Sequence, residues 1–356
     1  MKKKMKYGLL LLLLFVTTGC TTYLKNSEGK PIINSTTGQS LAENILCRPT
    51  DEETIKLYEE SGFDLTKLPY CVCKSDKVVE KVKVEASSET SAEVVEDKKE
   101  TSSETSSEVL YETKEVDCEE YTITSGGYDG LWTSIFVKPL AWVILFFGKI
   151  TTSFGVGLII TSILIRLIVY PLTKKSTVQA ENMKKIQPEL QKIEKKYANK
   201  DQKDREVMMM KSQEMMALYK KHNVSPMAGC LPALLQLPLF IAFLDAINRV
   251  PAIFEEKFLF FHLGTTPRIG IGNGNWWYII LTLLVALTTY FSLNKASNNT
   301  SGGDNDMAKQ TKMMTNIFTI LIIVMSVFMS SALNIYWITS NVCTLVQNYI
   351  VKRSMK

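Results

Sequence analysis

Long apolar stretches alternate with charged segments along this chain, and the alternation predicts an integral membrane protein. Five stretches of 18 to 22 residues are apolar enough to cross a bilayer as helices: 153–172, 226–247, 276–293, 313–330 and 332–351. A helix satisfies its own backbone hydrogen bonds, which lipid cannot do. The sequence therefore predicts an all-α membrane protein whose core, over 153–351, is a bundle of five transmembrane helices.

A sixth apolar stretch, 130–152, is interrupted by Lys138 and Pro139. The neighbouring charge decides its position. Segment 173–222 carries 13 basic and 7 acidic residues, and basic loops remain in the cytoplasm. If 130–152 also crossed the membrane, this basic segment would lie outside. We therefore expect 130–152 to be an amphipathic helix along the outer interface. Its two tryptophans are the expected headgroup anchors: Trp132 and Trp142.

The first 20 residues have the pattern of a secretory signal. Four lysines within the first six residues precede the apolar run 9–16, and a small residue, Gly19, then precedes Cys20. This order resembles a bacterial lipoprotein cleavage box, in which 1–19 is the signal peptide and the thiol of Cys20 is lipidated. Ordinary signal cleavage or an uncleaved anchor are the alternatives. In each case the chain after Cys20 begins outside the cytoplasm.

The outer part of the chain is acidic, since residues 21–130 carry 12 basic and 24 acidic residues. We expect a small extracytoplasmic region at 20–73 and an acidic, disordered linker at 74–125, because Ser, Glu and Lys dominate the linker and cannot form a core. No enzyme motif occurs here. Four cysteines allow three disulfide pairings, with a zinc site as the weaker alternative: Cys47, Cys71, Cys73 and Cys118. Two more cysteines, Cys230 and Cys343, lie in apolar helices and are expected to be packing residues.

The basic segment 173–223 predicts a cytoplasmic helical hairpin. Apolar residues recur at helical spacing in its first half: Ile186, Leu190, Ile193 and Tyr197. A turn near 198–201 precedes a second, methionine-rich helix at 207–219. Packing within the hairpin accounts for most of these methionines, and binding of varied apolar partners is a secondary role. The short tail 352–356 is expected to be cytoplasmic as well.

Arg166 is the candidate functional residue, because it lies inside the apolar run 153–172. A guanidinium remains charged and must find water or an anion. No acidic residue lies in that run or well inside the other long apolar runs. We therefore expect Arg166 to face a hydrated cavity between helices. The alternative is an arginine near a helix end that reaches toward lipid headgroups.

Polar residues form stripes on four of the predicted spans. The last span carries one at spacings of three and four: Asn334, Trp337, Asn341, Thr344 and Asn348. The other three carry shorter ones: Ser162, Arg166 and Tyr170; Ser225, Gly229, Pro232 and Gln236; Thr282, Thr289 and Ser292. Hydrogen bonding between helices explains a single stripe. Four stripes with an arginine favour a hydrated groove. Asp245 is expected to be an interface residue at the outer end of the second span.

Residues 153–351 resemble the YidC/Oxa/Alb family of membrane protein insertases. Seven blocks carry the resemblance: LIRL at 164–167, YPL at 170–172, IQPE at 186–189, KKY at 195–197, SPMAGCLP at 225–232, QLPLFIA at 236–242 and YWITSN at 336–341. Two features depart from the family pattern. The junction 330–334 lacks Pro and Gly, and Thr288, Thr289 or Ser292 stand where the third span often has Gln.

The resemblance implies a groove that is closed toward the outside and open to the cytoplasm and to lipid. Its arginine maps to Arg166. The substrate-binding groove is expected to comprise Arg166, Ser162, Gln236, Thr289, Trp337, Asn341 and Thr344. The implied function is insertion and chaperoning of nascent membrane proteins in the bacterial plasma membrane, without covalent catalysis, ATP, metal or cofactor. The ribosome, a Sec-type translocon and membrane lipids are expected partners, whereas sequence-specific binding of nucleic acid is not.

Two other classes of function fit less well. A secondary transporter would use Arg166 to bind a small anion, but the sequence has neither a second inverted half nor a buried carboxylate for coupling. A lipoprotein scaffold would use the outer part alone and the spans as an anchor. Polar stripes on four spans argue against mere anchoring.

Overall fold

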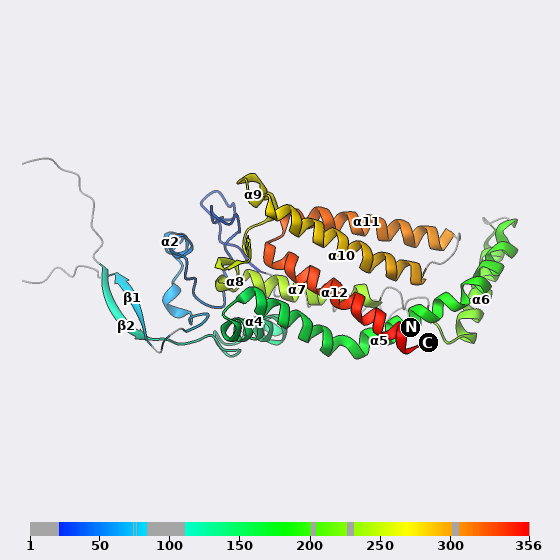
Figure 1. Cartoon of the computed structure of the whole chain (residues 1–356), viewed down its shortest axis with the longest axis horizontal. Helices are drawn as coiled ribbons and strands as arrows, with labels where there is room; N and C mark the ends of the chain where they lie inside the picture. The colour runs from blue at the N-terminus through cyan, green and yellow to red at the C-terminus, as the bar shows by residue number, and fades with distance from the viewer. Residues whose placement is uncertain are drawn as a thin grey trace, which may run out of the picture.

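The computed structural model describes residues 21–73, 75, 77–83, 111–200, 204–225, 231–300 and 306–355. The expected signal peptide, the lipidation site Cys20 and Cys230 lie outside the described residues. The protein is mostly helical and elongated, with a small sheet of β1 and β2 near one end and helix α6 at the other (Figure 1). The predicted α-helical class is therefore confirmed for the part carrying the apolar stretches.

Five long helices carry those stretches: α5 (Phe154–Ala198), α7 (Leu231–Asn248), α10 (Trp277–Thr300), α11 (Asp306–Phe328) and α12 (Ser331–Ser354). Within the described residues, two helices are long and apolar enough to cross a membrane: the continuous helix Gly130–Thr151 and α5. Three shorter apolar segments lie within α7, α10 and α11. The five-span arrangement stays a prediction.

The stretch predicted to lie along the interface is a continuous helix made of α3 (Gly130–Trp132), the π-helical turn η2 (Thr133–Val137) and α4 (Lys138–Thr151). Lys138 and Pro139 do not interrupt it; the two residues follow directly on the π-helical turn, and the helix continues through both. The chain reverses at Thr152 and α4 packs along α5. A Cβ at Gly157 of α5 would lie 2.6 Å from the Gly148 nitrogen of α4, so the two backbones almost touch.

Helix α5 continues far beyond the predicted first span. The predicted span ended at Leu172, whereas α5 runs for 45 residues with Pro171 and Pro188 inside it. Its far end packs against α6 (Arg205–Lys221). Ile186 and Leu190 of the predicted apolar stripe are buried in that contact together with Met183, Leu218 and Tyr219, and Ile193 packs against them partly buried. The first span and the first half of the hairpin are thus one rigid element.

The outer part of the chain is more ordered than predicted. It contains α2 (Glu52–Glu60), the 3₁₀ turn η1 (Leu65–Lys67) and the strands β1 (Lys77–Lys83) and β2 (Tyr111–Asp117). The strands pair antiparallel, with Lys77 opposite Asp117 and Lys83 opposite Tyr111. Both ends of the linker that was expected to be disordered are therefore strands. Their composition cannot form an apolar core, but pairing of the two strands satisfies their backbone hydrogen-bonding groups. Residues 84–110 lie outside the described residues.

Short elements join α7 to α10 at the outer end: α8 (Pro251–Glu255), β3 (Lys257–Phe258), β4 (Phe261–His262) and α9 (Pro267–Gly272). Glu256 within this connection caps α5. Its carboxylate accepts hydrogen bonds from the Ser153 hydroxyl at 2.6 Å and from the Phe154 backbone N–H. A carboxylate at a helix N-terminus also complements the helix dipole. This contact fixes the start of the helix that carries Arg166.

Candidate functional site

Arg166 points inward from α5 toward α7 and α12. Its Nε donates to the Ser340 hydroxyl at 3.0 Å, and its Nη2 donates to Ser340 and to the Gln236 side-chain oxygen. No described carboxylate forms an ion pair with Arg166, and no hydrogen bond of the described residues uses its Nη1. The guanidinium is therefore held between helices by neutral groups, with N–H donors left for water or an anion.

The partners of Arg166 are themselves fixed. Gln236 donates to the Tyr336 hydroxyl at 3.0 Å, and Tyr336 is buried against Phe243 with ring centroids 4.1 Å apart. The Gln347 side chain of α12 donates to the backbone carbonyl of Arg166 at 3.1 Å. α5, α7 and α12 are thus joined around one cation through a chain of polar side chains.

A second polar cluster joins α10 to α12. The buried hydroxyl of Thr289 accepts hydrogen bonds from the Trp337 indole N–H at 3.1 Å and from the Asn341 amide at 3.0 Å. The Trp337 ring also meets Phe240 of α7 edge to face, with centroids 5.1 Å apart. Three of the predicted groove residues therefore meet at one point, although none of the described hydrogen bonds connects them to Arg166.

The other predicted groove residues make local contacts. The Ser162 hydroxyl is buried and donates to the Leu158 carbonyl at 2.7 Å, and Thr344 donates to the Ser340 carbonyl at 2.9 Å. Asn334, at the start of the predicted stripe, donates to the Ser326 carbonyl at 2.9 Å. The Asn334 amide thus joins α12 to α11. Such hydrogen bonding between helices was the alternative explanation for the polar stripes.

Sequence reasoning did not select Ser340 or Gln347. Both lie on a second face of α12, where Tyr336, Ser340, Cys343 and Gln347 recur at spacings of four, three and four. That spacing is as regular as the stripe that was chosen, so periodicity could have found it.

Asp245 occupies a different position from the one predicted. It is 3% exposed at the end of α7, and it accepts hydrogen bonds from Thr21, through N–H at 3.1 Å and hydroxyl at 2.8 Å, and from the Trp132 indole at 3.0 Å. The expected interface residue is thus buried, because the outer part of the chain folds back over the end of α7. Trp132 is buried too, so it is not the headgroup anchor that the sequence suggested.

The outer cysteines form disulfides. Cys47 pairs with Cys71 and Cys73 with Cys118, one of the three pairings that the sequence allowed. Thiolates are therefore not available for the alternative zinc site. Among the described residues, no group of three or more His, Cys, Asp or Glu side chains is placed to hold a metal ion.

Comparison with known proteins places the chain in a family. Residues 146–356 match the family model described as 60Kd inner membrane protein. The membrane protein insertase YidC of Oceanobacillus iheyensis is 36% identical over 230 residues, which are 64% of this chain and 86% of that relative. The membrane protein insertase MisCA of Bacillus subtilis is 35% identical over 222 residues, which are 62% of this chain and 79% of that relative. The chain belongs to the YidC/Oxa/Alb family.

A solved structure of an active YidC insertase with its first transmembrane domain resolved also aligns with the chain. The alignment has a TM-score of 0.44 and 24% identity, and it covers 64% of this chain and 48% of that one. The predicted family resemblance, made on blocks between residues 164 and 341, is confirmed by the family model and by the curated relatives.

Proposed function

We propose that the protein inserts nascent membrane proteins into the bacterial plasma membrane and assists their folding. The observation that carries the proposal is the environment of Arg166. Its guanidinium is held between three helices by Ser340 and Gln236, while no described carboxylate neutralises it. An anionic or hydrophilic segment of a client protein supplies the missing partner. Membership of a family whose curated relatives are named insertases supports the same function.

The physical basis of insertion is electrostatic attraction followed by partition into lipid. A hydrophilic tail of the client enters from the cytoplasm, and Arg166 attracts its negative charge more strongly than it would in bulk water, because the surroundings have a lower effective dielectric constant. Water in the groove shortens the hydrocarbon path for the tail. The apolar segment of the client then moves into lipid, and this burial drives the process without ATP.

Trp337 and Asn341 line the groove beside Arg166 in this proposal, with Thr289 holding both in place. Ser162 and Thr344 extend the polar lining along α5 and α12. The exposed side of α11 is apolar over most of its length, which suits contact with lipid: Ile317, Phe318, Ile320, Leu321, Val324, Met325 and Phe328. The client's apolar segment leaves along such lipid-facing surfaces.

The proposed topology follows from charge. Five spans place the basic α5–α6 hairpin and the tail 352–356 in the cytoplasm, and the acidic outer part on the other side, with a lipid on Cys20 after cleavage of residues 1–19. The outer part and α6 do lie at opposite ends of the molecule (Figure 1). The helix Gly130–Thr151 remains on the outer side in this topology, since a sixth crossing would put 13 basic residues outside. Ribosomes and a Sec-type translocon are proposed partners at the cytoplasmic end and in the membrane.

Reconstitution tests the proposal. The purified full chain in liposomes is presented with a single-span client bearing an acidic tail, in the absence of nucleotide. We expect the tail to become protected from protease only when the protein is present. Equal protection in empty liposomes, or uptake of a small anion without protection of any client, would contradict insertion and favour a transporter.

A further inference from the structure

Residues 21–73 and 118–129 form a compact unit at the outer end, here called the outer cap. Three of its segments lie side by side, because Tyr70 bridges Arg48 on one side and Glu120 on the other. Backbone hydrogen bonds hold the arrangement: Arg48 donates to Pro69 at 2.9 Å, Tyr70 to Glu119 at 2.8 Å and Tyr121 to Tyr70 at 2.8 Å. The segment around Tyr70 is thus the centre of the cap.

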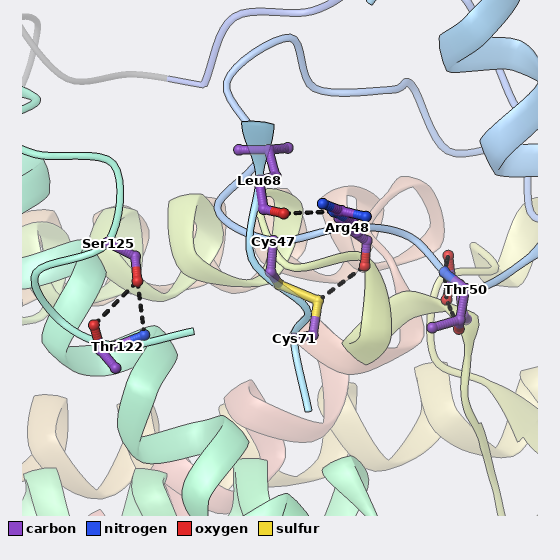
Figure 2. Close-up of a disulfide and its surroundings, with 8 residues drawn as sticks. Cys47, Arg48, Thr50, Leu68, Cys71, Thr122 and Ser125 are labelled. Atoms are coloured by element: carbon purple, nitrogen blue, oxygen red, sulfur yellow. Dashed lines mark hydrogen bonds between the residues drawn. A yellow bond between two sulfur atoms is a disulfide. The ribbon is translucent and has the colours of Figure 1, made fainter. Parts of the chain in front are cut away.

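The two disulfides join these same segments. Cys47–Cys71 connects the first to the central one, and Cys73–Cys118 connects the central one to the third at the base of β1 and β2. Figure 2 shows the first bond beside Arg48, whose guanidinium donates to the Leu68 carbonyl at 2.5 Å. The two disulfides differ in exposure: Cys47 and Cys71 are 0% and 2% exposed, whereas Cys73 and Cys118 are half-buried.

The buried disulfide lies where the cap meets the helices. Leu46, Cys47, Cys71 and Tyr121 of the cap belong to one continuous apolar core with residues of α3, η2, α4 and α7. Docking of the cap therefore buries the disulfide against the helices α3, α4 and α7, and not only within the cap.

Buried charges add specificity to this contact. Arg249, 3% exposed at the end of α7, donates to the Asn44 carbonyl of the cap at 2.5 Å and lies 3.8 Å from the Asp129 carboxylate. Lys138 of α4 is 1% exposed and pairs with Asp129 at 3.1 Å. Asp245 binds Thr21 as described above. A buried charge that loses its partner is costly, so cap and helices are matched as one assembly.

The cap is outside the region that defines the family, since the family model matches residues 146–356 only. We infer that the cap is an oxidation-dependent lock on the outer end of this insertase, and that the protein is itself a client of extracytoplasmic dithiol oxidation. The inference rests on the proposed topology, which places the cap on the oxidising side of the membrane.

The oxidation step uses a protein disulfide as the oxidant. The Cys47 and Cys71 thiols lose two electrons and two protons, their S–S bond forms, and the donor disulfide is reduced to a dithiol. A protein oxidant cannot reach the thiols of Cys47 and Cys71 in the docked cap, where the two residues are 0% and 2% exposed. Oxidation of this pair therefore precedes docking of the cap, whereas Cys73 and Cys118 remain open to exchange afterwards.

Limited proteolysis of the full-length protein in spheroplasts tests the lock. Cys47→Ser/Cys71→Ser is the test variant, and Cys73→Ser/Cys118→Ser is the matched control. We expect tryptic cleavage after Lys56, which lies in α2 inside the loop that Cys47–Cys71 closes, to accelerate about tenfold or more in the test variant, because local opening is no longer restrained by a covalent bond. Cleavage after Lys56 in the control should stay close to the wild-type rate. Equal rates in wild type and test variant would overturn the inference.

Two further measurements keep the inference independent of misfolding and of insertion activity. Asp245→Asn, which leaves all cysteines in place, should also speed cleavage after Lys56; an unchanged rate contradicts docking through Asp245. In the wild-type protein, a reductant without denaturant should release Cys73 and Cys118 for alkylation well before Cys47 and Cys71. Simultaneous release contradicts the burial of the bond. Cleavage that occurs only in inverted vesicles would overturn the topology and the inference with it.

Discussion

Arg166 and Ser340 are 174 positions apart in the chain, yet the guanidinium Nε of Arg166 donates to the Ser340 hydroxyl at 3.0 Å. A hydroxyl orients the cation without neutralising its charge. Had a carboxylate stood at position 340, the ion pair would have satisfied Arg166 internally and left little attraction for a client. The neutrality of its partners is therefore the feature on which the proposed function depends.

Replacement of Arg166 tests the role of charge. Arg166→Glu should lower insertion of a client with an acidic tail about tenfold or more, because attraction becomes repulsion at low effective dielectric. Arg166→Lys keeps the charge and should retain most of the activity. The measurement is protease protection of the client tail in liposomes. Equal activity of the two variants would remove charge attraction from the mechanism.

The hydrogen bonds around Arg166 should also stabilise the bundle. Gln236→Ala removes an acceptor from the guanidinium and a donor from Tyr336, and should cost about 1.5–3 kcal/mol, the range for hydrogen bonds to charged groups. Thermal unfolding in detergent measures the effect. Thr339→Val is the control, since the Thr339 hydroxyl donates only to the Ile335 carbonyl of its own helix. A control as destabilised as Gln236→Ala would speak against the network.

The close approach of α4 and α5 predicts intolerance of a side chain at Gly157. A Cβ there would lie 2.6 Å from the Gly148 nitrogen and 2.7 Å from the Ile144 carbonyl oxygen, both backbone atoms that cannot move aside. Gly157→Ala should therefore lower the free energy of unfolding by about 1–3 kcal/mol. Gly272→Ala, where nothing lies within 4 Å of the added Cβ, is the matched control and should change little. Equal unfolding temperatures for the two variants would contradict the packing.

The outer end should lose stability in mild acid because of His262. Burial lowers the pKa of His262 below its ordinary value of 6.5, and nearby Lys257 acts in the same direction, while a hydrogen bond to the Phe254 backbone and the charge of Asp51 oppose it. The unfolded chain therefore binds a proton first as the pH falls. The contribution of His262 is present above pH 6.5 and is lost as the pH drops toward the lowered pKa.

Melting curves of wild type and His262→Gln between pH 7.5 and 5.5 isolate this effect. Glu255 lies half-buried in the same connection between α7 and α10, and burial raises the pKa of its carboxyl, so its contribution to stability has the opposite sign and grows as the pH falls. Subtracting the pH dependence of the His262→Gln variant from that of the wild type removes the contribution of Glu255. We expect the wild type to lose more stability toward pH 5.5 than the variant does. If the melting temperatures of the two proteins change with pH in parallel, protonation of His262 does not contribute to the pH dependence of stability.

Sequence reasoning found the helices and much of the polar interior, but not which residues meet. It placed Arg166 between helices and grouped Trp337 with Asn341, and those two do converge on Thr289. It missed Ser340 because a small hydroxyl often bonds to its own helix, and only the position of α5 shows that this one does not. The contact depends on tertiary packing, which spacing along one helix cannot reveal.

Other differences have equally local causes. The first span was predicted to end at Leu172, yet α5 continues through Pro171 and Pro188 to Ala198 and joins the span to the hairpin. The strands β1 and β2 were hidden in a charged, serine-rich composition. The disulfide Cys73–Cys118 joins the two strands at their base and links residues 45 positions apart. The sequence allowed three disulfide pairings and gave no means of choosing this one.

Site-specific crosslinking of nascent chains tests the central claim most directly. Photocrosslinkers are placed at Asn341 and at Ile165, next to Arg166, with the exposed Ile320 of α11 as the control position. Stalled ribosome–nascent-chain complexes of increasing length are then presented. The account predicts adducts to the client from the two groove positions that fade as its apolar segment enters lipid. Adducts to lipid alone at every chain length would contradict a groove that carries clients.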